Sequence, residues 1–115
     1  MHGMHWTISA GQHQAGIVQC GAALQSYRVG DDALVDGFGD DELPAGHAGQ
    51  LLAPWPNRIA GGAYSWQGRR HQLPLSEPSR GNAIHGLACW EPWTLLDRAP
   101  DRVRHSQRAL YSSHF

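Results

Sequence analysis

The sequence contains 115 residues, the size of one small domain, which excludes a multidomain enzyme within this chain. Hydrophobic residues make up 41% and charged residues 17%, and 14 Gly with 7 Pro indicate a globular, turn-rich chain rather than low-complexity disorder. Nine arginines and no lysine balance ten acidic residues, and this net charge of -1 argues against nucleic acid as the main partner.

The positive charge is concentrated in the second half of the chain. Residues 1–50 contain Arg28 as their only arginine against six acidic residues, whereas residues 51–115 contain eight arginines against four acidic residues. We therefore expect the cationic contacts with a ligand to come from the second half.

The cysteines and the apolar segments indicate a reduced, soluble protein. Cys20 and Cys89 form no C-x-x-C pair and are too few for a disulfide scaffold, so we expect two buried thiols. The N-terminal residues lack the pattern of a secretion signal, and no segment approaches the roughly 20 apolar residues that cross a bilayer. We expect a cytoplasmic protein with no membrane contact.

The first half of the chain alternates in polarity like a set of short strands. The alternation predicts strands near residues 14–20, 22–29 and 33–36, separated by glycine-containing turns. Residues 37–49 are acidic and rich in glycine, which predicts a loop. Residues 51–62 carry two prolines that restrict the preceding residues, so we expect a stiff, non-helical segment.

The second half continues the same character. Residues 64–66 and 70–73 flank a turn in which Gly68 can adopt positive φ, so they predict a β-hairpin. Residues 73–86 read as a loop, and residues 93–97 as another strand. No stretch of ten or more residues has a helical period, so the sequence predicts an all-β fold with strand edges that need covering.

Two short segments carry candidate chemistry. Arg58 follows Asn57 on the proline-stiffened segment, where its fixed donors could hold hydroxyls or instead bridge loop carbonyls. His85 precedes Gly86 and could exchange a proton near neutral pH, although most histidines have surface or structural roles. Trp55 could offer an apolar face to a sugar ring or pack in the core. No H-E-x-x-H motif occurs, so we expect no metal site.

Taken together, these segments resemble the aldose 1-epimerase (mutarotase) family over about residues 6–103. The motifs PWPNRI and NAIHG, in this order and spacing, are fairly specific to it. The matching pieces are residues 16–30, 36–42, 49–75 and 82–87, followed by Trp90 and Trp93. The resemblance implies an antiparallel β-sandwich, the galactose mutarotase-like supersandwich.

The resemblance also implies an activity and a site. The family is an isomerase family that interconverts the α and β anomers of a free aldohexose by general acid–base ring opening, and it requires no cofactor or metal. By motif, Asn57 and Arg58 resemble the family's sugar-contacting pair. His85 resembles its first active-site histidine, which lies near the ring oxygen. The family's main proton donor, a second histidine, and its proton acceptor, a glutamate, lie farther along a longer chain.

We therefore expect residues 1–103 to form the N-terminal part of such a sandwich, truncated and weakly active or inactive alone, followed by a divergent tail at 104–115. Its expected partner is a small sugar, and its oligomeric state stays open. Two alternatives remain. One is a hexose-phosphate 1-epimerase, with Arg69, Arg70 or Arg80 meeting the phosphate, and the other is a non-catalytic carbohydrate-binding remnant.

Overall fold

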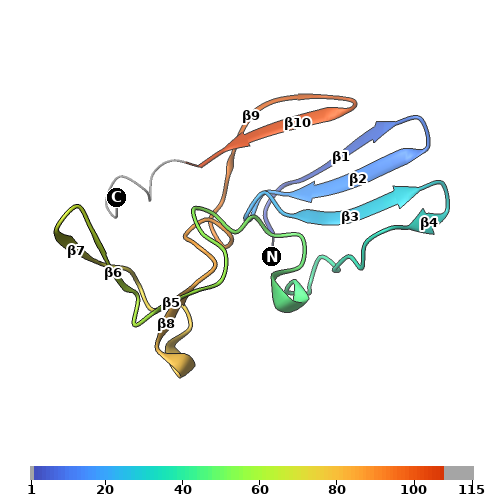
Figure 1. The fold of residues 1–115 in the computed structure, drawn as a ribbon. Helices are drawn as coiled ribbons and strands as arrows, with labels where there is room; N and C mark the ends of the chain where they lie inside the picture. The colour runs from blue at the N-terminus through green and yellow to red at the C-terminus, as the bar shows by residue number, and fades with distance from the viewer. Residues whose placement is uncertain (1, 108–115) are drawn as a thin grey trace. The chain divides into compact units, whose positions relative to one another are not determined.

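The computed structural model describes residues 2–107 as short antiparallel strands and two 3₁₀ turns (Figure 1). These residues divide into two compact units, one formed by 2–51 with 89–107 and the other by 52–88. The predicted antiparallel all-β fold is therefore confirmed, with almost no helix in the described residues. No helix among them is long and apolar enough to cross a membrane.

A four-stranded antiparallel sheet is the main element of the first unit (Figure 1). Its order follows the chain: β1 (His5–Ala10), β2 (His13–Val18), β3 (Leu24–Val29) and β4 (Asp32–Ala33). The strands expected near 14–20 and 22–29 are β2 and β3. The third expected strand is much shorter than 33–36, since only its first residue lies in β4.

A hairpin of β9 (Thr94–Ala99) and β10 (Arg102–Ser106) lies beside β1. The Ser9 amide donates to the Pro100 carbonyl at 2.8 Å, and the rings of Trp6 and His105 meet edge to face with centroids 4.6 Å apart. Burial lowers the pKa of His105, because desolvation disfavours the charged imidazolium. Apolar packing and one backbone bond thus attach the hairpin to the sheet.

The core of the first unit is small. Val18, Ala23 and Phe38 form its buried cluster. Cys89 is buried and Cys20 half-buried, both are free thiols, and burial raises the pKa of each. The expectation of two thiols rather than a disulfide is confirmed, although only Cys89 is fully buried.

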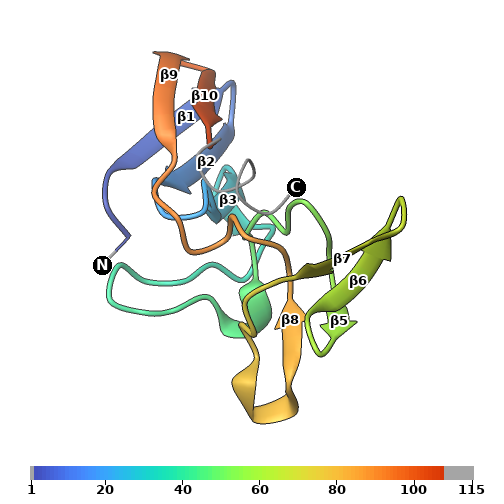
Figure 2. The ribbon, with the colours of Figure 1, turned by 90° about the vertical axis from the view of Figure 1, so that its left-hand side faces the viewer.

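The second unit consists of two two-stranded ribbons (Figure 2). β5 (Arg58–Ala60) pairs with β8 (Asn82–Ile84), and β6 (Ala63–Trp66) pairs with β7 (Arg69–Gln72). A 3₁₀ turn, η2 (Pro78–Arg80), precedes β8. The predicted hairpin is confirmed as β6 and β7, with Gln67 at φ 50° and Gly68 at φ 75° in its two-residue turn.

Four strands, β1, β5, β8 and β10, were not expected as strands from the sequence. β8 lies inside residues 73–86, which were expected to be a loop, and β1 was not anticipated. β10 occupies residues 102–106, where no clear pattern was found, so the expected tail at 104–115 begins inside a strand. The rest of that tail, residues 108–115, lies outside the described residues.

Candidate functional site

The ladder between β5 and β8 brings the two predicted motifs together. Arg58 lies opposite Ile84, and Ile59 opposite Ala83. Ala83 is buried and Ile59 half-buried, so this apolar pair faces inward while Arg58 faces solvent. Segments 28 residues apart in sequence, PWPNRI and NAIHG, therefore run side by side (Figure 2).

Asn57 and His85 cap the open end of this ribbon with two reciprocal hydrogen bonds. The backbone N–H of Asn57 donates to His85 Nδ1, and the backbone N–H of His85 donates to the backbone carbonyl of Asn57, each at 2.9 Å. Both residues have positive φ, 66° for Asn57 and 59° for His85. A non-glycine residue in the left-handed region is strained by roughly 1–2 kcal/mol, and such strain clusters at functional sites. Two hydrogen bonds thus hold this end of the ribbon in a conformation that its residue types rarely adopt.

The bond to Nδ1 decides which nitrogen of the His85 imidazole carries the proton. A nitrogen that accepts from a backbone N–H carries no proton, so neutral His85 holds its proton on Nε2. Neutral His85 therefore has Nε2–H as a hydrogen-bond donor.

Gly86 lets the chain pass close to the neighbouring backbone. It adopts φ 74°, and a Cβ at this position would overlap the Ala53 carbonyl oxygen. The next amide, that of Leu87, donates to the same carbonyl at 2.8 Å. The peptide between Ala53 and Pro54 is cis. Gly86 therefore permits a close approach of the Ala53 backbone.

Arg58 is held by a carboxylate that sequence reasoning did not select. Its Nε and Nη2 donate to Oε1 and Oε2 of Glu77, both at 2.8 Å. This bidentate pair uses two of the five guanidinium N–H groups, while 41% of the Arg58 side chain stays exposed. The guanidinium is thus both anchored and accessible.

Glu77 is itself held from several sides. Asn82 Nδ2 donates to Glu77 Oε1 at 3.0 Å, and the backbones of the two residues exchange hydrogen bonds of 2.9 and 3.2 Å. The bonds from Arg58 and Asn82, with the charge of nearby Arg80, lower the pKa of Glu77 from 4.5 to about 2. The Glu77 carboxylate is therefore ionised at neutral pH.

The remaining candidates differ in how far they are exposed. Trp55 is half-buried, and Arg69, Arg70 and Arg80 are exposed. Arg69 and Arg70 lie on β7, whereas Arg80 lies on η2, close enough to Glu77 to affect its pKa. Within residues 2–107, no group of three or more histidine, cysteine, aspartate or glutamate side chains could hold a metal ion.

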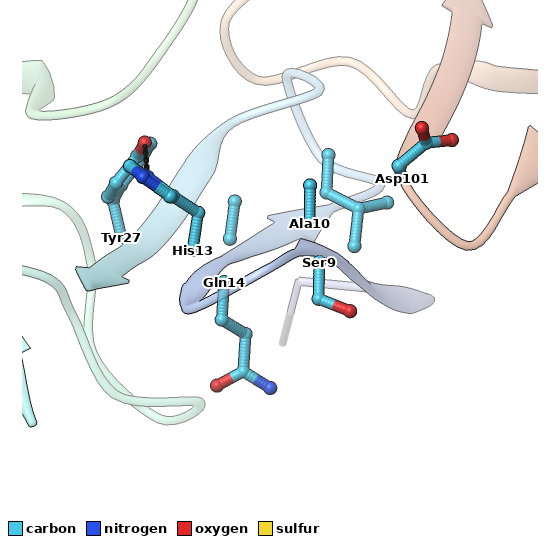
Figure 3. Close-up of a pocket in the computed structure, with 8 residues that line it drawn as sticks. Ser9, Ala10, His13, Gln14, Tyr27 and Asp101 are labelled. Atoms are coloured by element: carbon cyan, nitrogen blue, oxygen red, sulfur yellow. Dashed lines mark hydrogen bonds between the residues drawn. The ribbon is translucent and has the colours of Figure 1, made fainter. Parts of the chain in front are cut away.

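A separate small pocket lies in the first unit (Figure 3). His13 and Tyr27 line one part of it, with His13 Nδ1 2.6 Å from the Tyr27 hydroxyl, and Asp101 lies across from them. Its volume, about 160 Å³, is below the roughly 300–1,000 Å³ of typical small-molecule sites. None of the predicted site residues lines it, so the β5–β8 ribbon is the better candidate.

Known proteins resemble this chain in sequence and in fold. A sequence model described as aldose 1-epimerase matches residues 4–113, nearly the whole chain. This chain belongs to the aldose 1-epimerase family. YihR of Escherichia coli K12, a protein named as uncharacterized, is 42% identical over 91 residues, which is 79% of this chain and 30% of YihR.

Solved structures of the family share the fold. The GalM/aldose epimerase homologue from C. elegans is 22% identical with a TM-score of 0.77, over 92% of this chain and 36% of that protein. A galactose mutarotase-like protein from Clostridium acetobutylicum is 20% identical with a TM-score of 0.74, over 95% and 37%. The chain thus spans about a third of the length of these proteins.

Proposed function

We propose that this chain carries the sugar-binding part of an aldose 1-epimerase that acts on a free aldohexose. The observation that carries the proposal is the reciprocal bonding of Asn57 and His85 beside Arg58. These bonds join the two segments that carry Arg58 and His85, and the proposal assigns the guanidinium and the imidazole to the same sugar. Such donors suit a molecule with several hydroxyls and a ring oxygen.

The proposed chemistry follows from the proton on His85. In this reaction a base removes the proton of the anomeric hydroxyl, an acid protonates the ring oxygen, the C1–O5 bond breaks, and rotation precedes closure on the other face. His85 Nε2–H would point its proton at the ring oxygen, while Arg58 and Asn57 hold hydroxyls. The base and the main acid, as in the family, would come from outside this chain, so we expect the chain alone to be weakly active or inactive.

The pairing of Arg58 favours a neutral sugar over a hexose phosphate. A hydroxyl needs only one or two of the N–H groups left on the guanidinium, whereas a phosphate would have to sit beside the Glu77 carboxylate. The exposed arginines at positions 69, 70 and 80 keep the hexose-phosphate alternative testable.

Binding is measured first, by NMR titration of the ¹⁵N-labelled chain with D-glucose, D-galactose, glucose 6-phosphate and the acyclic polyol sorbitol. We expect the Asn57 and His85 amides to shift with the two free hexoses and not with sorbitol. A stronger response to glucose 6-phosphate would favour the hexose-phosphate alternative, and no response to any sugar would contradict the proposal.

Catalysis is measured by polarimetry of freshly dissolved α-D-glucose. His85→Asn keeps an acceptor for the Asn57 backbone N–H but removes the imidazole Nε2–H that the proposal directs at the ring oxygen, so sugar binding should lose that one contact. Any acceleration by the wild-type chain should then fall by about a hundredfold or more. Sugar binding without acceleration in the wild type would instead support a non-catalytic carbohydrate-binding remnant.

A further inference from the structure

We propose that Glu77 is the positioning residue of this site: it orients the Arg58 guanidinium toward the sugar and makes the site prefer uncharged sugars over phosphorylated ones. The inference rests on the proposed function and adds a residue that no motif in the sequence marked. Its basis is the geometry around the Glu77 carboxylate.

Glu77 fixes both the place and the rotation of the guanidinium. Two parallel bonds of 2.8 Å from Nε and Nη2 leave the planar group no freedom to turn about its own axis. A single-point contact would allow the long side chain of Arg58 to sample many rotamers. The remaining N–H groups therefore point in a fixed direction before any ligand arrives.

The carboxylate is rigid because it is fastened to the same ribbon as Arg58. Asn82 lies opposite Ala60 in the β5–β8 ladder, and its side chain donates to Glu77 Oε1 at 3.0 Å. Two backbone bonds join residues 77 and 82 across η2. The side chain of Glu77 is only 17% exposed, compared with 41% for Arg58. Glu77 is therefore part of the scaffold, and Arg58 is the group that meets the ligand.

The same arrangement separates two classes of sugar. The carboxylate occupies one of the bidentate edges that a guanidinium offers to a phosphate, and it places a negative charge beside the others. A neutral hydroxyl is not repelled by this charge, whereas a phosphate is. Removing the charge of Glu77 should therefore lower the affinity for neutral sugars, because Arg58 is no longer oriented, and should remove the repulsion of phosphorylated sugars.

The test compares D-glucose and glucose 6-phosphate binding by NMR in the wild-type chain and in Glu77→Gln. We expect glucose affinity to fall roughly tenfold, the lower end of the effect of removing groups that orient metal ligands. Glucose 6-phosphate affinity should stay unchanged or rise, so that the ratio of the two affinities moves by at least that factor. The Arg58 Nε–H resonance reports loss of the pair directly.

Asp97→Asn is the matched control. Asp97 lies on β9 and accepts a hydrogen bond of 2.8 Å from Arg104 on β10, so this variant removes a carboxylate that pairs with an arginine away from the candidate site. It should change neither affinity. Glu77→Asp, which keeps the charge but shortens the reach, should retain the preference for glucose over its phosphate even where affinity falls. Equal weakening of both sugars in Glu77→Gln, or no weakening while the Arg58 signal is lost, would overturn the role of Glu77. A wild-type chain that binds neither sugar would overturn the proposed function as well.

Discussion

Two antiparallel ribbons of this chain each carry an arginine–carboxylate pair, but the two pairs are held in different ways. In the β9–β10 ribbon, Asp97 is 41% exposed and faces Arg104 at 2.8 Å and Arg102 at 3.7 Å. In the β5–β8 ribbon, Glu77 is 17% exposed and grips Arg58 through both carboxylate oxygens.

The difference lies in what surrounds the carboxylate. Glu77 also accepts from Asn82, and the backbones of these two residues are bonded to each other. An exposed pair contributes about 0–1 kcal/mol, because solvent screens it and two long side chains must be ordered. A partly buried carboxylate with three hydrogen bonds holds its partner in one orientation, which is what a binding site requires and a surface ribbon does not.

The largest expected effect tests how tightly the end of the β5–β8 ribbon is built. Gly86→Ala adds a methyl group where the Ala53 carbonyl oxygen already lies, in a residue with φ 74°. We expect a loss of about 3 kcal/mol in the free energy of unfolding, from backbone strain and overlap together. Urea unfolding followed through NMR signals of residues 52–88 measures it.

Gly81→Ala is the control for this experiment. Gly81 ends η2 on the same ribbon with φ 67°, but no atom lies within 4 Å of an added Cβ. Only the conformational strain applies, so we expect about 1 kcal/mol. Equal losses in the two variants would show that the close approach of Gly86 to Ala53 does not matter.

A smaller effect is expected when the geometry of each arginine is changed while its charge is kept. Arg58→Lys loses the planar fork that pairs with Glu77 and should weaken D-glucose binding roughly tenfold, or about 1.4 kcal/mol. Arg104→Lys makes the same change on the β9–β10 ribbon and should leave the affinity unchanged. NMR titration of both variants measures the effect. A similar loss of D-glucose affinity in the two variants would show that the sugar does not bind at the β5–β8 ribbon.

Much of the fold was predictable from local pattern. Alternating polarity located β2 and β3, and the Gln67 and Gly68 turn located the β6–β7 hairpin. Pattern failed where strands are held by distant partners. β8 has only three residues, and its pairing with β5 spans a loop whose Pro and Ser content favours turns. β10 was missed because His105 is packed by Trp6, a contact that is not visible in the local sequence.

The candidate site could be selected from the sequence only in part, and its residues stay a prediction. The motifs around Asn57, Arg58 and His85 were selected by resemblance, and the structure places them on paired strands. Glu77 was not selected, because it belongs to no motif. Its role depends on the return of the chain through η2, which brings it within 2.8 Å of Arg58. The only sequence signal was an acidic residue near an arginine-rich region, which is too common to select one position.

The pH dependence of stability tests how firmly Glu77 is held in the folded chain. The pKa of Glu77 is about 2 in the folded chain and near 4.5 in the unfolded chain, so the unfolded state takes up the proton first as pH falls. The stabilisation by Glu77 is therefore complete above about pH 5 and is lost between about pH 4.5 and pH 2. The difference in unfolding free energy between wild type and Glu77→Gln should shrink over this window. A constant difference from pH 7 to pH 2 would contradict this linkage.

The smallest expected effect is on the exposed ribbon. Asp97→Asn removes the charge that faces Arg102 and Arg104, and we expect the free energy of unfolding to fall by less than about 1 kcal/mol, because both arginines keep more than half of their side chains in solvent. Added salt should reduce this small loss further, since it screens exposed pairs. The loss caused by Glu77→Gln should respond less to salt, because its carboxylate is mostly shielded and its bonds are short. Urea unfolding of both variants at low and high salt measures the contrast, and an equal response to salt would mean that the two ribbons hold their pairs in the same way after all.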